Sequence, residues 1–303
     1  MNFQFLANGM VAGAMIGLGA IGVTLTYSIL RFSNFAHGEL ISWGAYATLV
    51  IAGLIGSLAP SLALSFGPFS FGPALVLAAV IGMALTGGLA LILDRILFKK
   101  LRAKTASITV VMASFGASMA LRALLEFLFT SRPVYFSRDL QIAMPIGFGI
   151  RITADQIALL FLTAILVLAL HLLLTYTQIG RAMRAVSESP TLARVAGIDV
   201  DHVIRITWIL GGALACASGV MLGLVVQIRP FMGFDLLLPL FAASILGGIG
   251  SVPGALVGGL IVGIAEAGAV VFIGAEWRAA VSFLLLIVVL LLKPTGLFGS
   301  QSR

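Results

Sequence analysis

Residues 206–228 read ITWILGGALACASGVMLGLVVQI, and this stretch contains no Asp, Glu, Lys or Arg. Residues 40–93 and 236–265 are likewise free of these four residue types. A helix at the surface of a soluble core shows a polar face, whereas these stretches are apolar on all sides, as expected of helices that lie in lipid. The sequence therefore predicts an integral membrane protein.

The composition agrees with this class of protein. Hydrophobic residues make up 60% of the chain and charged residues 10%, with a mean hydropathy of +1.16. The 35 glycines suit close helix–helix contact in lipid, where small residues let backbones approach. At roughly 30–35 residues per helix and loop, residues 1–303 form one transmembrane domain with no separate soluble domain. The single cysteine, Cys216, cannot form an internal disulfide.

The apolar stretches predict an all-helical bundle of eight or nine segments that cross or re-enter the membrane. The seventh segment has about 13 residues and is too short to span unless it is tilted, re-entrant or broken. The predicted segments are residues 5–30, 37–58, 74–97, 106–129, 154–176, 204–226, 236–248, 253–273 and 278–292.

Basic residues decide the orientation, because short cytoplasmic loops carry an excess of Lys and Arg. If every segment crosses, eleven basic residues fall on one side and five on the other. The richer side holds the clusters at 99–104 and 181–205 and is predicted to be cytoplasmic, with the N-terminus outside and the C-terminus inside. This distribution accounts for the net charge of +7 without a nucleic acid partner. Residues 60–73 and 131–153 then form external loops, the second with a short hairpin.

Several catalytic signatures are absent from the sequence. It contains no Gly-Lys dipeptide, so it has no phosphate-binding loop and does not hydrolyse ATP itself. It also lacks G-x-S-x-G and H-E-x-x-H. The three histidines are far apart and offer no convincing metal set. We therefore expect no catalytic site, no metal and no cofactor.

The most concentrated polar cluster near a membrane segment is Asn34-Phe35-Ala36-His37-Gly38-Glu39. An imidazole and a carboxylate two residues apart at the start of a span are costly unless they are paired or face water. Asn34, His37 and Glu39 therefore either line or gate a permeation path, or cap the helix, where Glu39 favours the positive N-terminal end. The sequence leaves both interpretations open.

Two further features interrupt the apolar pattern. Residues 247–254, GGIGSVPG, break the helical pattern, and irregular backbone at membrane depth is tolerated only when it is buried in protein or lines a cavity. Gly247, Gly248, Gly250 and Gly254 thus mark either a broken element beside a translocation path or an ordinary cytoplasmic turn. Glu266 is a lone carboxylate in an apolar run, which predicts either an interhelical hydrogen bond or a substrate contact.

Other spacings concern packing within and between helices. Arg122 and Glu126 lie four residues apart on one predicted helix and are expected to neutralise each other. Glycines recur at four-residue spacing at 9, 13 and 17 and again at 250, 254 and 258, on segments of opposite direction. The recurrence indicates either an inverted repeat, as in many transporters, or two ordinary small-residue packing faces.

The most informative polar segment is the predicted cytoplasmic loop 177–205. Ser189 suits an N-cap, Pro190 the first helical position and Gly197 the residue after the helix end. Between them Thr191–Ala196 forms about two turns, roughly 10 Å long, and so short a helix needs a docking surface. Four apolar residues are expected to make that contact, and three charged residues flank it: Ala193, Val195, Ala196, Ile198, Arg184, Glu188 and Arg194.

Four motifs in order along nearly the whole chain resemble those of the LivH-type permease family of branched-chain amino acid ABC importers. They are residues 34–39 (NFAHGE), the loop from GRAMRA at 180–185 to Gly197-Ile198, residues 247–254, and KPTGLFG at 293–299. The resemblance implies a multi-pass permease of the bacterial inner membrane that carries branched-chain or other hydrophobic amino acids. It implies a second permease subunit, two cytoplasmic ATPase subunits and a periplasmic binding protein as partners, with lipid around the bundle.

The resemblance also gives the short loop helix a role. In that family the loop corresponding to residues 184–198 carries the coupling helix that docks into an ATPase groove. The expected coupling residues are Arg184, Glu188, Ser189, Pro190, Ala193, Arg194, Ala196, Gly197 and Ile198, and the expected path residues are Asn34, His37, Glu39, Gly247, Gly248, Gly250, Gly254 and Glu266. Importers of urea and short amides are related, and an ion-coupled secondary transporter is a further alternative, although Glu39, Asp94 and Glu266 make a thin proton relay.

Overall fold

The computed structural model describes residues 3–102, 106–137, 141–147, 149–293 and 295–299. Lys104, Arg138, Pro294 and Arg303, which enter the sequence argument, lie outside the described residues. The elements are α1 (Gln4–Leu30), α2 (Ala36–Leu58), α3 (Pro60–Ala63), α4 (Pro73–Leu93), a π-helical turn η1 (Asp94–Phe98), α5 (Lys99–Arg102), α6 (Ser107–Phe129), β1 (Met144–Gly147), β2 (Ile150–Ile152), α7 (Ala154–Tyr176), α8 (Gln178–Glu188), α9 (Pro190–Val195), α10 (Val200–Val225), α11 (Met232–Gly247), α12 (Val252–Phe272), η2 (Ala275–Trp277) and α13 (Arg278–Leu292).

The all-helical membrane architecture is confirmed. Within the described residues, eight helices are long and apolar enough to cross a membrane, and α11 is a shorter apolar helix. Every predicted segment coincides with one of these nine helices. The predicted hairpin in the external loop is also present, because β1 and β2 pair antiparallel. The chain is therefore a multi-pass membrane protein.

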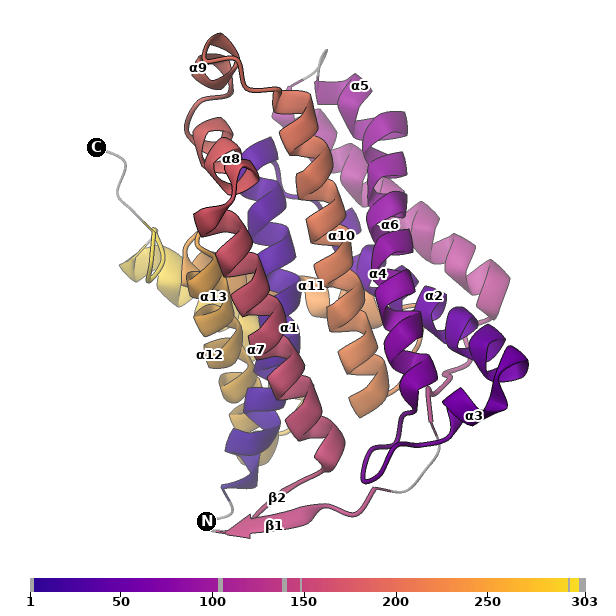
Figure 1. The fold of residues 1–303 in the computed structure, drawn as a ribbon. Coiled ribbons are helices and arrows are strands. Elements are labelled where there is room, and N and C mark those ends of the chain that lie inside the picture. Colours follow the sequence, from indigo (N-terminus) through magenta and orange to yellow (C-terminus); the bar gives the residue numbers. More distant parts are fainter. Residues whose placement is uncertain (1–2, 103–105, 138–140, 148, 294, 300–303) are drawn as a thin grey trace.

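Helix α1 runs through the middle of the bundle, and most of its residues are buried (Figure 1). It packs antiparallel to α12 through the glycine ridge that the sequence displays. A Cβ atom added to Gly13 would lie 2.7 Å from the Cα atom of Leu260, and one added to Gly9 would lie 2.6 Å from that of Ile264. No side chain larger than hydrogen fits at these distances, so the ridge allows the two backbones to touch.

The second glycine ridge has a different partner. Gly254 and Gly258 face α11, where an added Cβ atom would collide with the backbone of Gly247 or Ala243. The two ridges thus serve two different helix contacts, as ordinary packing faces do. An internal repeat stays a prediction.

Helix α2 begins inside the bundle and not at its edge. After α1 ends, Arg31 adopts a left-handed conformation with φ of 56°, and the chain turns back along α1. His37 then lies against Gly22, since a Cβ atom on that glycine would be 2.6 Å from His37 Cε1. Gly22 is eight residues before Leu30, which places the start of α2 about 12 Å inside the end of α1.

Helix α11 is a short apolar helix, as the length of its segment predicted. Its 16 residues cover about 24 Å, less than the ~30 Å of a bilayer core. It begins beside α2, where Gly233 N donates a 3.0 Å hydrogen bond to Ser42 Oγ. It ends at Gly247, and just beyond it Gly250 N donates a 3.2 Å hydrogen bond to Thr24 Oγ1, near Ser28, in the last two turns of α1.

The two ends of the bundle differ in charge and in structure. One end, which we call the basic end, carries α5, α8 and α9 (Figure 1). There Arg31 Nη2 donates to the carbonyl oxygens of Ser187 (3.0 Å) and Glu188 (2.8 Å). The opposite end, which we call the hairpin end, holds the start of α1 and the β-hairpin, joined by hydrogen bonds between Gln4 and Arg151.

Candidate functional site

The first turns of α2 form a buried polar centre, as the NFAHGE motif suggested. Asn34, His37 and Glu39 are all buried. Asn34 Oδ1 accepts a 3.1 Å hydrogen bond from Ala36 N, so this side chain caps the start of the helix. Its amide nitrogen, like His37 Nε2, is buried without a hydrogen-bond partner among the described residues. Capping therefore accounts for only part of the cluster.

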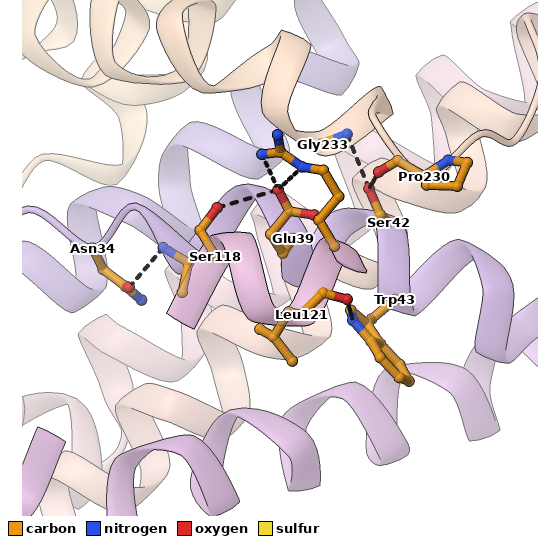
Figure 2. A network of polar contacts seen from close by, with 10 residues as sticks. Asn34, Glu39, Ser42, Trp43, Ser118, Leu121, Pro230 and Gly233 are labelled. Carbon is orange, nitrogen blue, oxygen red and sulfur yellow. Dashed lines mark hydrogen bonds and ion pairs between the residues drawn. The ribbon is translucent and has the colours of Figure 1, made fainter. Parts of the chain in front are cut away.

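Glu39 is held by α6 (Figure 2). Its Oε1 atom accepts hydrogen bonds from Ser118 Oγ at 3.2 Å, Arg122 Nε at 3.1 Å and Arg122 Nη2 at 2.7 Å. Its other oxygen, Oε2, is buried and accepts nothing from the described residues. The expected neutralisation of Arg122 by Glu126 is therefore wrong, because the guanidinium turns toward α2.

Helix α11 completes this centre. Ser42 Oγ donates to Pro230 O at 3.0 Å and accepts from Gly233 N, which fixes the start of α11 against α2 (Figure 2). The guanidinium of Arg122 lies over the rings of Phe234, at 4.1 Å, and Phe231, at 4.9 Å. A cation at such distances is attracted to the ring faces. Helices α2, α6 and α11 thus meet at one charged and aromatic point.

The Gly247–Gly254 segment lies elsewhere, as a turn between α11 and α12. Gly248 and Gly250 have φ angles of 97° and 93°, which favour glycine. The C-terminal segment packs on this turn, since Leu297 N donates to Leu246 O at 2.8 Å and Phe298 N to Gly247 O at 3.1 Å. This geometry matches a tight turn whose ends, Gly247, Gly248 and Gly254, are buried while Ile249 and Gly250 are exposed.

Glu266 also lies apart from the start of α2. It is buried, and its Oε2 accepts from Arg278 Nε at 2.7 Å while Oε1 accepts from Ser282 Oγ. Both partners belong to α13, so the carboxylate joins α12 to α13. The structure therefore does not bring together all eight predicted path residues. Asn34, His37 and Glu39 lie at the start of α2, the four glycines lie in or beside the α11–α12 turn, and Glu266 lies farther along α12.

The loop between α7 and α10 contains the capped short helix that the sequence predicts, shifted by one residue. Ser189 Oγ accepts from Leu192 N at 3.3 Å, Pro190 is the first helical residue, and Gly197 has φ of 82°. Before it, α8 is capped by Thr177, whose side chain accepts from Gly180 N. The loop is thus two consecutive capped helices at the basic end.

The exposed face of α9 differs from the expected one. Ala193 is buried within this chain, so its predicted place on the docking face is wrong. Val195, at 83%, and Ala196 are exposed as expected, and Leu192, which the sequence argument omitted, is 70% exposed. Arg184 Nη1 donates to Leu174 O, so it ties α8 to the end of α7. The other two flanking charged residues, Glu188 and Arg194, are exposed beside α9.

Two ion pairs lie near the start of α10, and sequence reasoning missed them. Lys99 Nζ lies 3.1 Å from Asp201 Oδ2 and joins α5 to α10, whereas Arg102 Nη2 lies 2.7 Å from Asp94 Oδ1 and joins α5 to η1. The ring of Phe98 in η1 stacks on Trp208 of α10, with centroids 5.2 Å apart. The first turn of α10 directly follows the α8–α9 loop, so the Lys99–Asp201 pair and the ring stack link the end of that loop to α5 and η1.

The protein family described as "Branched-chain amino acid transport system / permease component" matches residues 5–290 of this chain. The chain belongs to this family. The permease resembles its curated relatives over nearly its whole length.

The LivH permease of the high-affinity branched-chain amino acid transport system of Escherichia coli (strain K12) is 34% identical, covering 98% of this chain and 95% of LivH. The corresponding permease BraD of Pseudomonas aeruginosa is 33% identical, with the same coverage. A probable LivH of Methanocaldococcus jannaschii is 29% identical over 98% of this chain and 92% of that protein. No solved structure matches the chain significantly.

Family membership gives the coarse function. The chain is a permease component of a branched-chain amino acid transport system, and its relatives are transport permeases and not enzymes. The polar centre of α2, buried in a bundle of apolar helices, is accordingly a candidate for contact with the transported molecule and not for catalysis.

Proposed function

We propose that this permease is the membrane subunit of an ABC importer that carries branched-chain or other hydrophobic amino acids into the bacterial cytoplasm. Two cytoplasmic ATPase subunits hydrolyse the ATP. A second permease subunit completes the pathway, and a periplasmic binding protein delivers the substrate at the hairpin end. The relatives named for high-affinity transport of branched-chain amino acids support the substrate class. The excess of basic residues at the opposite end supports a cytoplasmic position for α8 and α9.

The observation that carries this proposal is α9. A six-residue helix capped at both ends, with Leu192 and Val195 exposed, is a rigid apolar projection from a membrane domain. Such side chains are stabilised when they enter a groove on another protein. We propose an ATPase groove as that site, with Glu188 and Arg194 at the rim, where charges set the register of docking.

The substrate path, in this proposal, passes the start of α2. Polar atoms without a hydrogen-bond partner in the described part of the chain lie there, on Asn34, His37 and Glu39. Within the membrane, such atoms are tolerated only beside protein or water. The Gly247–Gly254 turn and Glu266 hold α11, α12 and α13 in position and act as supports of the path.

Uptake into proteoliposomes tests the proposal. The permease is reconstituted with its second permease and both ATPase subunits, with ATP on the ATPase side and leucine-loaded binding protein on the other. We expect leucine to accumulate only with ATP and only while the lysine of the ATPase phosphate loop is intact. Accumulation of urea or a short amide in place of leucine would support the related amide importers. Uptake abolished by an ionophore but independent of ATP would overturn the ABC assignment.

A further inference from the structure

Arg122 occupies an unusual position for a charged residue. It lies seven residues before Phe129, the last residue of α6, and therefore about 10 Å from the nearer end of that helix. An arginine at such depth is costly in lipid and normally faces the bundle interior or a water-filled cavity. The Arg122 side chain is only 13% exposed, so the bundle covers most of it.

The ion pair between Arg122 and Glu39 is incomplete. A paired arginine and carboxylate commonly form two parallel bonds that use both carboxylate oxygens. Here Nε and Nη2 of Arg122 and Oγ of Ser118 all donate to Oε1 of Glu39. The buried Oε2 atom accepts nothing from the described residues, and such an atom is unfavourable without a donor. The Glu39 side chain is fully covered in this conformation, so a further donor reaches Oε2 only after a rearrangement of α2, α6 and α11 that opens the centre.

An apolar surface lies directly beside this pair. The rings of Phe231 and Phe234 stack against the guanidinium and are themselves 45% and 39% exposed. A hydrophobic side chain that approached the pair would find these rings next to the two charges.

We propose that Glu39, Arg122, Phe231 and Phe234 form the recognition point for the zwitterionic head and the apolar side chain of an amino acid on the path. The substrate ammonium donates to Glu39 Oε2, the substrate carboxylate accepts from the guanidinium, and the side chain packs on the two rings. This inference rests on the proposed function and deepens it, because it selects amino acids over urea and short amides. Those molecules carry neither charge and leave the charged partners unmatched.

The same contacts are also compatible with a purely structural pair that fastens α2 to α6. The two roles respond differently to neutralisation. If the pair is structural, removing one charge leaves the other buried without a partner and destabilises the protein. Removing both charges then restores assembly and uptake. If the pair recognises a zwitterion, the doubly neutral protein assembles but has lost the groups that bind the substrate.

The experiment compares Glu39→Gln, Arg122→Gln and the double variant in the reconstituted complex, with assembly measured by gel filtration and leucine uptake measured with saturating binding protein. We expect the double variant to assemble as well as the wild type while its uptake falls roughly tenfold or more. The matched control is Asp94→Asn with Arg102→Gln, a largely buried carboxylate–arginine pair with the same 2.7 Å contact at the basic end, and it keeps most of its uptake.

Recovery of wild-type uptake in the Glu39→Gln, Arg122→Gln double variant overturns the inference and leaves the proposed function intact. Absence of leucine uptake by the wild-type complex overturns both. If the double variant does not assemble, Arg122→Lys decides, since it keeps the charge but loses the planar guanidinium. We expect that variant to assemble and to lose uptake, and uptake at the wild-type rate would again refute the inference.

Discussion

Replacing Leu192 by Glu is the most direct test of how α9 meets its partner. The Leu192 side chain is 70% exposed on a helix whose two ends are capped, so the change alters the projecting surface and not the packing behind it. Full burial of a leucine side chain contributes about 1.5–3 kcal/mol, and the exposed fraction thus corresponds to about 1–2 kcal/mol in a docked complex. Since 1.4 kcal/mol is tenfold in affinity, the ATPase is expected to bind about 5- to 30-fold more weakly.

The assay measures binding of the purified ATPase subunits to the permease in nanodiscs, together with ATP-driven uptake in proteoliposomes. Leu64→Glu is the matched control, because Leu64 is also a 70% exposed leucine, and it follows α3, between α2 and α4 near the hairpin end (Figure 1). We expect the control to bind ATPase with wild-type affinity. Equal ATPase affinity and equal uptake for Leu192→Glu and the wild type would refute docking through α9. Equal weakening by both variants would indicate a general loss of stability.

Three further substitutions test other parts of the reasoning. Gly197→Val should reduce ATP-driven uptake, because the left-handed backbone at φ 82° costs a β-branched residue roughly 1–2 kcal/mol, whereas Gly197→Asn should retain it. Gly13→Leu should destabilise the permease by roughly 1–3 kcal/mol or more in thermal unfolding, while Gly53→Leu should not, because an added Cβ atom at Gly53 meets nothing within 4 Å. Arg102→Ala should cost about 3–5 kcal/mol of stability, because it strands a buried aspartate. Lys99→Ala, in an exposed pair, should stay within about 1 kcal/mol of the wild type.

The helices were predictable because few backbone conformations are stable in lipid. A long stretch without charges must satisfy its backbone internally, and each such stretch became a helix. The predicted helix ends were less accurate where polar side chains determine them. The segment predicted to end at residue 97 continues to Arg102, which pairs with Asp94 about two turns earlier. The segment predicted from residue 204 begins at Val200, because Asp199 caps it with a 3.0 Å hydrogen bond from His202 N.

The partner of Arg122 was not predictable from local spacing. A residue four positions away on the same helix is always near, which made Glu126 the natural choice. The actual partner, Glu39, is 83 residues away and reaches Arg122 only because α2 begins deep inside the bundle and crosses α6. Nothing in the apolar pattern specifies that depth, since the turn after Leu30 depends on the fit of His37 against Gly22.

The face of α9 illustrates a different limit. Two helical turns contain too few residues for a periodic pattern, so Ala193 and Leu192 were both compatible with docking. In the structure the smaller residue faces the neighbouring helices and the larger one projects, as close packing of small residues predicts. Size was therefore a better guide than hydrophobicity for choosing the inner side of so short an element.

The arrangement of contacts explains how one short helix could influence a site deep in the membrane. The loop that carries α9 leads into α10, whose Trp208 stacks on Phe98, and Phe98 in turn lies 5.3 Å from Phe32 in the link between α1 and α2. All three rings are buried, so a displacement of α10 cannot be absorbed by empty space around them. A connected set of buried rings therefore joins α10, which follows the α9 loop, to the α1–α2 link, and a displacement of α9 in a transport cycle would reach the start of α2 through that link.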